Sequence, residues 1–131
     1  MTLDPRYAGE SIYREHVLDH YKNPRNKGTL KNADVIQKEL NPVCGDQITI
    51  SLIFENSKVK DIRFEGQGCV ISQASASMLS ETLVGKRKED IKNLTREDML
   101  ELLGIPLGPA RIKCALLGLV ALKNSIREEK P

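Results

Sequence analysis

The chain has 131 residues, of which 40% are hydrophobic and 29% are charged, a composition typical of one soluble globular domain. Its 20 basic and 18 acidic residues are interspersed and give a net charge of +2, so nothing in the charge pattern requires a nucleic-acid partner. No segment stays apolar long enough to span a bilayer, and the N-terminal region is too charged for a signal peptide. We therefore expect a single domain over residues 1–131 that is cytoplasmic and binds neither nucleic acid nor membrane.

The N-terminal quarter predicts one helix followed by a surface loop. Apolar residues recur with helical spacing through residues 11–21, Val17 and Tyr21 among them, and Ser11 is a suitable N-cap. The stretch that follows contains Asn, Pro and Gly at close intervals, so residues 23–34 predict a loop.

The next segment predicts an antiparallel sheet. Apolar and polar residues alternate over residues 47–54 and again over 59–64, with turn-forming residues at 55–58 between them. A shorter strand is expected over residues 33–40. Because hairpin-connected strands commonly bury one face only, we expect a small three-stranded sheet packed against helices.

The C-terminal half predicts helices only. Residues 71–83 are dense in Ala and Ser, residues 86–93 form a short helix or link, and Thr95 caps a helix that runs through Leu103. Pro109 suits the first turn of a last helix that ends near residue 126. The apolar residues expected on the buried side of that helix are Leu116, Leu117, Val120 and Leu122. Helix, then strands, then helices is the element order of an α+β domain.

Three cysteines, Cys44, Cys69 and Cys114, carry the chemistry that the sequence offers. An odd number in a reducing compartment argues against a disulfide framework and favours metal binding or thiol chemistry. Their separations differ from the paired CxxC knuckles of a zinc ribbon, so spacing alone is a weak metal signal. The alternative for each cysteine is a small buried hydrophobic side chain.

Each thiol nevertheless has a local environment that favours reactivity. Cys69 comes just before a predicted helix, whose N-terminus stabilises a thiolate. Arg111 and Lys113 precede Cys114, and positive charge lowers a thiol pKa. Asp46 follows Cys44 by two residues, although it is also a common turn former after glycine. Three thiolates and one carboxylate suit Zn²⁺ or an iron-sulfur cluster, and the harder carboxylate makes cluster binding labile.

Four ordered segments of the chain resemble the U-type iron-sulfur scaffold family, which comprises the IscU, SufU and NifU N-terminal proteins. The segments are YREHVLDHYKNPRNKG at 13–28, NPVCGD at 41–46, GQGCVISQASASM at 66–78 and ARIKCALLGLVALK at 110–123. The resemblance covers nearly the whole chain. It implies an IscU/SufU-like fold in which the three cysteines and the aspartate lie together at one end.

The resemblance also implies a function for the site. Cys44, Asp46, Cys69 and Cys114 would bind a [2Fe-2S] cluster while it is built from iron and sulfur, or Zn²⁺ in its absence. A cysteine desulfurase would deliver persulfide sulfur, with Cys114 as the acceptor, and the finished cluster would pass to acceptor proteins. Tyr13 matches a family tyrosine associated with contacts between scaffold molecules, hence with a homodimer; its alternative role is that of a core-facing aromatic residue.

Two positions depart from the IscU pattern. Lys113 replaces the histidine that precedes the last cysteine in IscU proteins, which makes Asp46 the expected fourth ligand. The sequence LGPAR stands where the chaperone-docking motif LPPVK would be. Both departures resemble SufU proteins, but the short spacer between Cys69 and Cys114 lacks the SufU insertion and resembles IscU.

Two functions therefore compete. The first is a non-catalytic scaffold that assembles and transfers a [2Fe-2S] cluster, and the second is a zinc-dependent, SufU-like sulfurtransferase that accepts persulfide. A cysteine hydrolase or a zinc-stabilised adaptor is a weaker third reading, because no histidine lies near a cysteine in the sequence. His16 and His20 stand four residues apart without the HExxH arrangement, so we expect them on an exposed helix face.

Overall fold

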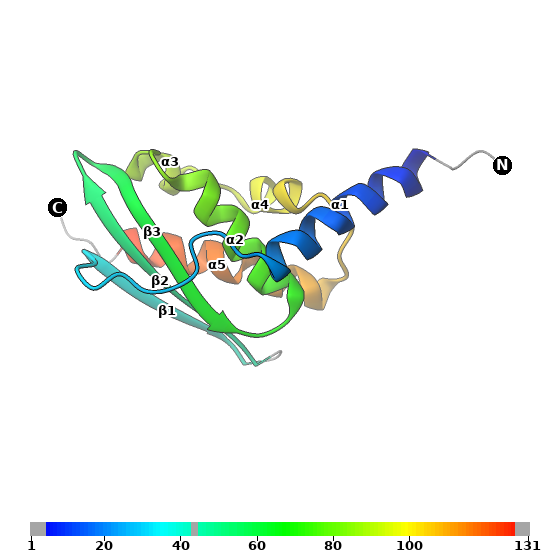
Figure 1. The fold of residues 1–131 in the computed structure, drawn as a ribbon, viewed down its shortest axis with the longest axis horizontal. Coiled ribbons are helices and arrows are strands. Elements are labelled where there is room, and N and C mark those ends of the chain that lie inside the picture. Colours follow the sequence, from blue (N-terminus) through cyan, green and yellow to red (C-terminus); the bar gives the residue numbers. More distant parts are fainter. Residues whose placement is uncertain (1–4, 43–44, 128–131) are drawn as a thin grey trace.

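The structure is a computed structural model that describes residues 5–42 and 45–127. It contains a three-stranded sheet and helices in an α+β arrangement, as predicted (Figure 1). In chain order the elements are α1 (Pro5–Lys22), β1 (Val35–Asn41), β2 (Asp46–Glu55), β3 (Lys58–Gln67), α2 (Val70–Leu83), α3 (Lys88–Lys92), α4 (Arg96–Leu103) and α5 (Pro109–Arg127). No helix in the described part of the chain is both long and apolar enough to cross a membrane.

The strands form an antiparallel sheet in the order β1, β2, β3. Asn56 and Ser57 connect β2 to β3 and have φ angles of 56° and 64°, the backbone of a type I′ turn whose twist matches that of the flanking strands. Alternation then places the apolar side chains of β2 on one face, where Ile48, Ile50 and Leu52 are at most 2% exposed.

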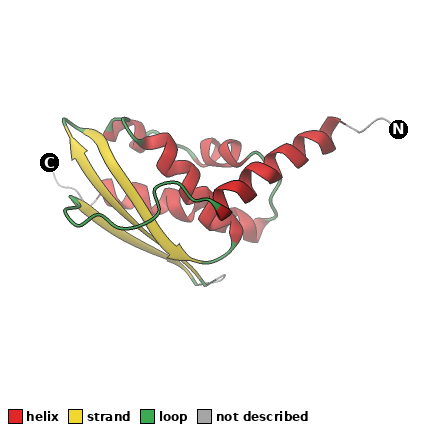
Figure 2. Ribbon diagram, in the orientation of Figure 1, coloured by secondary structure: helices red, strands yellow, loops and turns green. Residues whose placement is uncertain are grey.

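The helices cover that apolar face of the sheet, and the sheet's other face lies away from them (Figure 2). α2 and α5 pack against each other and against the strands, and α1 packs on α2. Small residues on α2, including Ala74 and Ala76, are at most 2% exposed, so the backbones of neighbouring helices approach closely. This packing carries the start of α2 and the first turns of α5 to the same end of the sheet as the start of β2.

The free edge of β3 is covered by the loop after α1. The Gly28 N–H donates to the Phe64 carbonyl, and the Phe64 N–H donates to the Asn26 carbonyl, at 2.8 and 3.0 Å. Asn26 adopts a left-handed φ of 61°, a conformation that asparagine tolerates better than most residues. The loop therefore satisfies backbone groups that would otherwise expose a sheet edge.

The structure contradicts the sequence prediction at several positions of α1 and α5. α1 begins at Pro5 rather than at residue 11, because proline is tolerated in the first turn of a helix, and Ser11 lies inside the helix rather than at its cap. Tyr21 is 43% exposed because the buried face of α1 passes through Val17 and His20 instead. Val120 is 43% exposed, and Leu119 is buried on α5 in its place.

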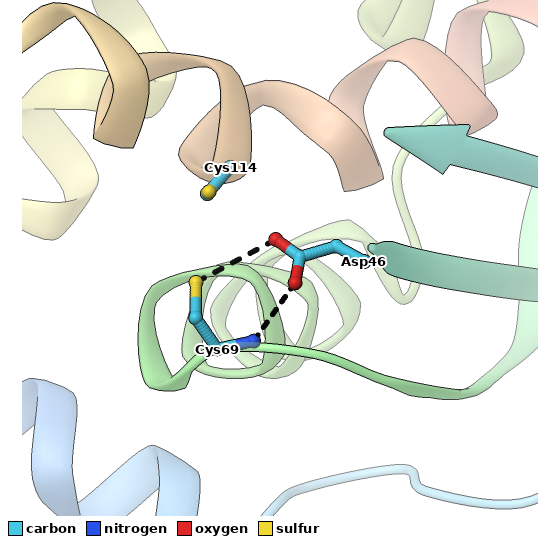
Figure 3. Close-up of side chains that lie close together, drawn as sticks. All are labelled: Asp46, Cys69 and Cys114. Atoms are coloured by element: carbon cyan, nitrogen blue, oxygen red, sulfur yellow. Dashed lines mark hydrogen bonds between the residues drawn. The ribbon is translucent and has the colours of Figure 1, made fainter. Parts of the chain in front are cut away.

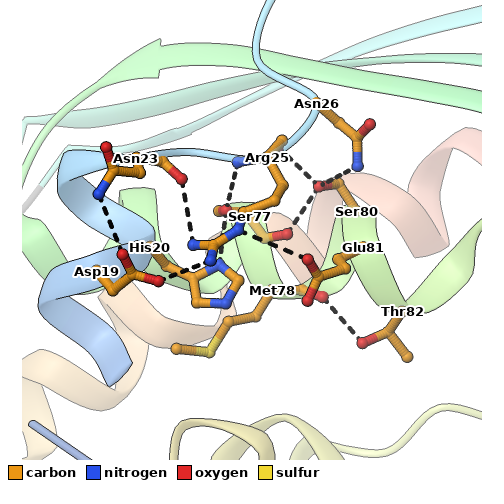
Figure 4. Close-up of polar contacts among 10 residues, drawn as sticks. All are labelled: Asp19, His20, Asn23, Arg25, Asn26, Ser77, Met78, Ser80, Glu81 and Thr82. Carbon is orange, nitrogen blue, oxygen red and sulfur yellow. Dashed lines mark hydrogen bonds and ion pairs between the residues drawn. The ribbon is translucent and has the colours of Figure 1, made fainter. Parts of the chain in front are cut away.

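His20 is 1% exposed, so the expectation of an exposed histidine pair holds for His16 alone. The His20 Nδ1 lies 2.8 Å from the Ser77 hydroxyl, which also accepts a hydrogen bond from the Arg25 backbone N–H (Figure 4). The contact joins α1, α2 and the loop that covers β3.

Burial lowers the pKa of His20 below its usual value of 6.5, and the charges of Arg25 and His16 lower it further, against opposing effects of Glu81 and Asp19. Between the lowered pKa and pH 6.5 the unfolded chain binds a proton that the folded protein does not. The stabilisation is therefore complete above pH 6.5 and is lost as the pH falls from there through the folded-state pKa.

We predict that the free energy of unfolding, measured with urea between pH 7.5 and 5.5, falls with pH in the wild-type protein and falls less in His20→Gln. His16→Gln is the comparison: it removes the His16 charge that lowers the pKa of His20 but leaves His20 buried, so it should keep most of the wild-type pH dependence. An unchanged pH dependence in His20→Gln would contradict the assignment.

Candidate metal centre

Asp46, Cys69 and Cys114 converge on one point, as the resemblance implied (Figure 3). Their ligand atoms, one carboxylate oxygen and two sulfurs, all lie within 4.8 Å of one another. Asp46 is the first residue of β2, Cys69 caps α2, and Cys114 is in the second turn of α5. Three elements that are distant in sequence thus supply one ligand each.

The Asp46 carboxylate is fixed by the start of α2. One oxygen, Oδ1, accepts a hydrogen bond of 2.9 Å from the backbone N–H of Cys69, and Oδ2 lies 3.6 Å from the Cys69 sulfur. The N-terminus of a helix favours a negative group, because its backbone N–H groups and its dipole both point toward it. One oxygen therefore serves the backbone while the other faces the thiols.

The burial of this carboxylate would favour a bound cation. Asp46 is 1% exposed, and no basic side chain in the described part of the chain forms an ion pair with it. A buried carboxylate that lacks a positive partner is costly, and a bound metal ion would supply the missing charge.

The two thiols differ in access. Cys69 is partly exposed, whereas Cys114 is 1% exposed and its thiol donates to the Ala110 carbonyl one turn earlier, at 3.7 Å. An incoming group therefore reaches Cys69 more easily than Cys114.

The donor set fits a tetrahedral metal ion. With metal–sulfur and metal–oxygen bonds of about 2.3 and 2.0 Å, tetrahedral angles separate sulfur and oxygen by about 3.5 Å. The observed distance from the Cys69 sulfur to Asp46 Oδ2 is 3.6 Å. A small inward movement of Cys114 would complete three positions around the ion, and the chemistry of two sulfurs and one oxygen suits zinc or iron.

The other predicted site residues have different outcomes. Cys44 lies outside the described residues, and so does the side chain of Tyr13 on α1. Arg111 and Lys113 are exposed near Cys114, and Lys113 borders a groove that it shares with β1 residues and the apolar side of α5. The proposed effect of these charges on Cys114 stays a prediction.

Comparison with known proteins identifies the family. Residues 12–130 match the NifU-like N terminal domain family, and the chain belongs to that family. It is 38% identical to the zinc-dependent sulfurtransferase SufU of Bacillus subtilis strain 168, over 92% of this chain and 93% of SufU. It is also 38% identical to the iron-sulfur cluster assembly scaffold protein IscU of Thermotoga maritima, over 89% of this chain and 94% of IscU.

The fold agrees with solved structures of the same kind. The crystal structure of FiSufU from Fervidobacterium islandicum AW-1 superposes with a TM-score of 0.75 at 28% identity, over 89% of this chain and 98% of that one. The predicted resemblance and the IscU/SufU-like fold are thereby confirmed. The relatives of this chain include a protein named as a scaffold and a protein named as a sulfurtransferase. Membership of the family is therefore compatible with either activity.

Comparing Asp46→Ala with Asp46→Asn isolates the hydrogen bond to the backbone. Asparagine keeps an acceptor for the Cys69 N–H, whereas alanine leaves that donor without one, which costs about 1–3 kcal/mol. We expect urea unfolding of the metal-free protein to show Asp46→Ala less stable than Asp46→Asn by this amount. Equal stabilities would mean that the hydrogen bond contributes nothing.

Proposed function

We propose that this protein is an iron-sulfur cluster assembly scaffold that builds a [2Fe-2S] cluster on Cys44, Asp46, Cys69 and Cys114 and passes it to acceptor proteins. The observation that carries the proposal is the convergence, within 4.8 Å, of two thiols and a buried carboxylate that forms no ion pair in the described part of the chain. The family includes proteins named as IscU scaffolds. We further propose that residues 1–131 act as one such domain.

Cys44 completes the proposed donor set by its place in the chain. It precedes Asp46 by two residues, so covalent geometry keeps the two Cα atoms within about 7.6 Å. Gly45, between them, has a φ of 72°, and its N–H donates to the Asn41 carbonyl at 2.8 Å. Three thiolates and a carboxylate would then hold iron, or Zn²⁺ when no cluster is present.

Sulfur would come from a cysteine desulfurase as a persulfide, and we propose Cys114 as its acceptor. Because Cys114 is 1% exposed and Cys69 is partly exposed, we propose that the donor approaches from the side of Cys69. A homodimer in which Tyr13 contacts a second scaffold molecule is part of the same proposal.

A zinc-dependent sulfurtransferase is the second candidate. It is favoured by the similarity to the SufU protein named for that activity and by Lys113 in place of the family histidine. On this alternative Zn²⁺ stays bound, and the cysteines accept persulfide without ever carrying a cluster.

Anaerobic reconstitution distinguishes the two functions. Incubating the protein with cysteine, a desulfurase, ferrous iron and a thiol reductant that converts persulfide sulfur to sulfide should give the visible absorption and Mössbauer spectra of a [2Fe-2S] cluster. Cys69→Ser should lower the yield strongly because a thiolate ligand is lost. Ser75→Ala is the control, since Ser75 is buried on the same helix and its hydroxyl donates to the Ile71 carbonyl rather than to a residue of the site. Tight Zn²⁺ retained throughout, with no cluster, would refute the scaffold proposal.

Mass spectrometry of peptides tests which cysteine accepts the persulfide. After reaction with a desulfurase and cysteine but no iron, we expect one added sulfur per chain, about 32 Da, on the peptide that contains Cys114. Cys114→Ser should abolish this addition while Cys69→Ser retains it. A persulfide that forms on Cys69 or Cys44 in the Cys114→Ser protein to the wild-type extent would show that Cys114 is not the acceptor.

A further inference from the structure

Gly68 packs directly against the Asp46 side chain. A Cβ atom added at Gly68 would lie 2.2 Å from Asp46 Oδ1, 2.6 Å from its Cγ and 2.9 Å from its Cβ. All three distances are shorter than van der Waals contact, so any side chain at position 68 would have to displace the carboxylate.

The nearby Gly66 is needed for a different reason. A Cβ atom there would lie 2.0 Å from the Gln47 backbone carbonyl oxygen, within the ladder that joins β2 to β3. Substitution of Gly66 would therefore disturb the sheet itself. At Gly68 the nearest atoms belong to a single side chain, and that side chain is the candidate oxygen ligand.

We propose that Gly68 is a positioning residue, whose missing side chain admits the Asp46 carboxylate to the space between Cys69 and Cys114. The ligand role of Asp46 rests on the function proposed above. The steric relation between Gly68 and Asp46 does not depend on it.

The geometry explains how a side chain at position 68 would act. The closest collision is with Oδ1, the oxygen that accepts the Cys69 N–H at 2.9 Å. Moving Oδ1 breaks that hydrogen bond and also withdraws Oδ2, which lies 3.6 Å from the Cys69 sulfur. The thiols would keep their places on α2 and α5 while the oxygen ligand leaves. With glycine at position 68, the site presents two sulfur atoms and a carboxylate oxygen as donors. With a larger residue there, it would present the sulfur atoms alone.

A double-mutant cycle of Gly68→Ala, Asp46→Gly and the double variant tests this relation, because Asp46→Gly removes all three colliding atoms. Zn²⁺ affinity is measured by competition with a chromophoric chelator, and stability by urea unfolding of the metal-free full-length protein. We expect Gly68→Ala to weaken Zn²⁺ binding roughly 10- to 100-fold. Asp46→Gly should weaken it by the same factor, and the double variant should bind no more weakly than either.

The stability measurement should show the same coupling. Gly68 has a φ of 149°, so alanine carries some backbone strain in both backgrounds, but its larger effect should disappear when Asp46 is absent. Gly66→Ala is the matched control and should destabilise the protein equally with Asp46 or Gly at position 46, because its collision is with backbone.

Several results would overturn the proposal: wild-type Zn²⁺ affinity in Gly68→Ala, losses that add in the double variant, or failure of both Gly68→Ala and the double variant to fold. If only Gly68→Ala fails to fold and the double variant folds, the rescue supports the proposal. Neither measurement uses a desulfurase or a cluster. The scaffold proposal can therefore fail while the coupling between Gly68 and Asp46 is still measured. Conversely, the protein can assemble a cluster while this coupling is absent.

Discussion

The site depends on one hydrogen bond, from the Cys69 backbone N–H to the Asp46 carboxylate. It joins the first residue of β2 to the residue that caps α2, 23 positions apart in the chain. The helix N-terminus stabilises the buried negative charge in place of a basic side chain, and this leaves the second carboxylate oxygen facing the thiols. The same contact therefore connects the sheet to the helix and orients the second carboxylate oxygen toward the Cys69 sulfur.

The packing of α5 against α2 places the second thiol, that of Cys114, at the site. Gly118 on α5 lies against Ala76 and Leu79 on α2, where even an added Cβ atom would be in ordinary contact at 3.5–3.7 Å. Because small residues let the two helices approach closely, Cys114 on α5 comes within 4.8 Å of the ligand atoms at the start of α2. Asp46 and Cys114 are therefore buried in the core, whereas Cys69 is partly exposed and is the most accessible of the three.

Much of this architecture was predictable from local sequence signals. Alternation identified the strands, and Thr95 and Pro109 fixed the starts of α4 and α5. Periodicity could not place Tyr21 or His20, because an amphipathic stripe leaves its rotation about the helix axis open until the packing partner is known. Nor could spacing bring Cys69 and Cys114 together: they meet through long-range packing, which the sequence indicated only through the family resemblance. Nothing in the local sequence pattern indicated that Gly68 makes room for Asp46.

The two proposed functions share this donor set and differ in the size of the group that the site would hold. A zinc ion needs only the space enclosed by its four ligands, whereas a [2Fe-2S] cluster contains two metal ions and two sulfides and must extend beyond them. In the described part of the site, Asp46 and Cys114 are each 1% exposed, while Cys69 and Gly45 open toward solvent. A larger cargo would therefore protrude on the side of Cys69, where an acceptor protein could reach it. The same opening that would let sulfur enter would thus let a finished cluster leave.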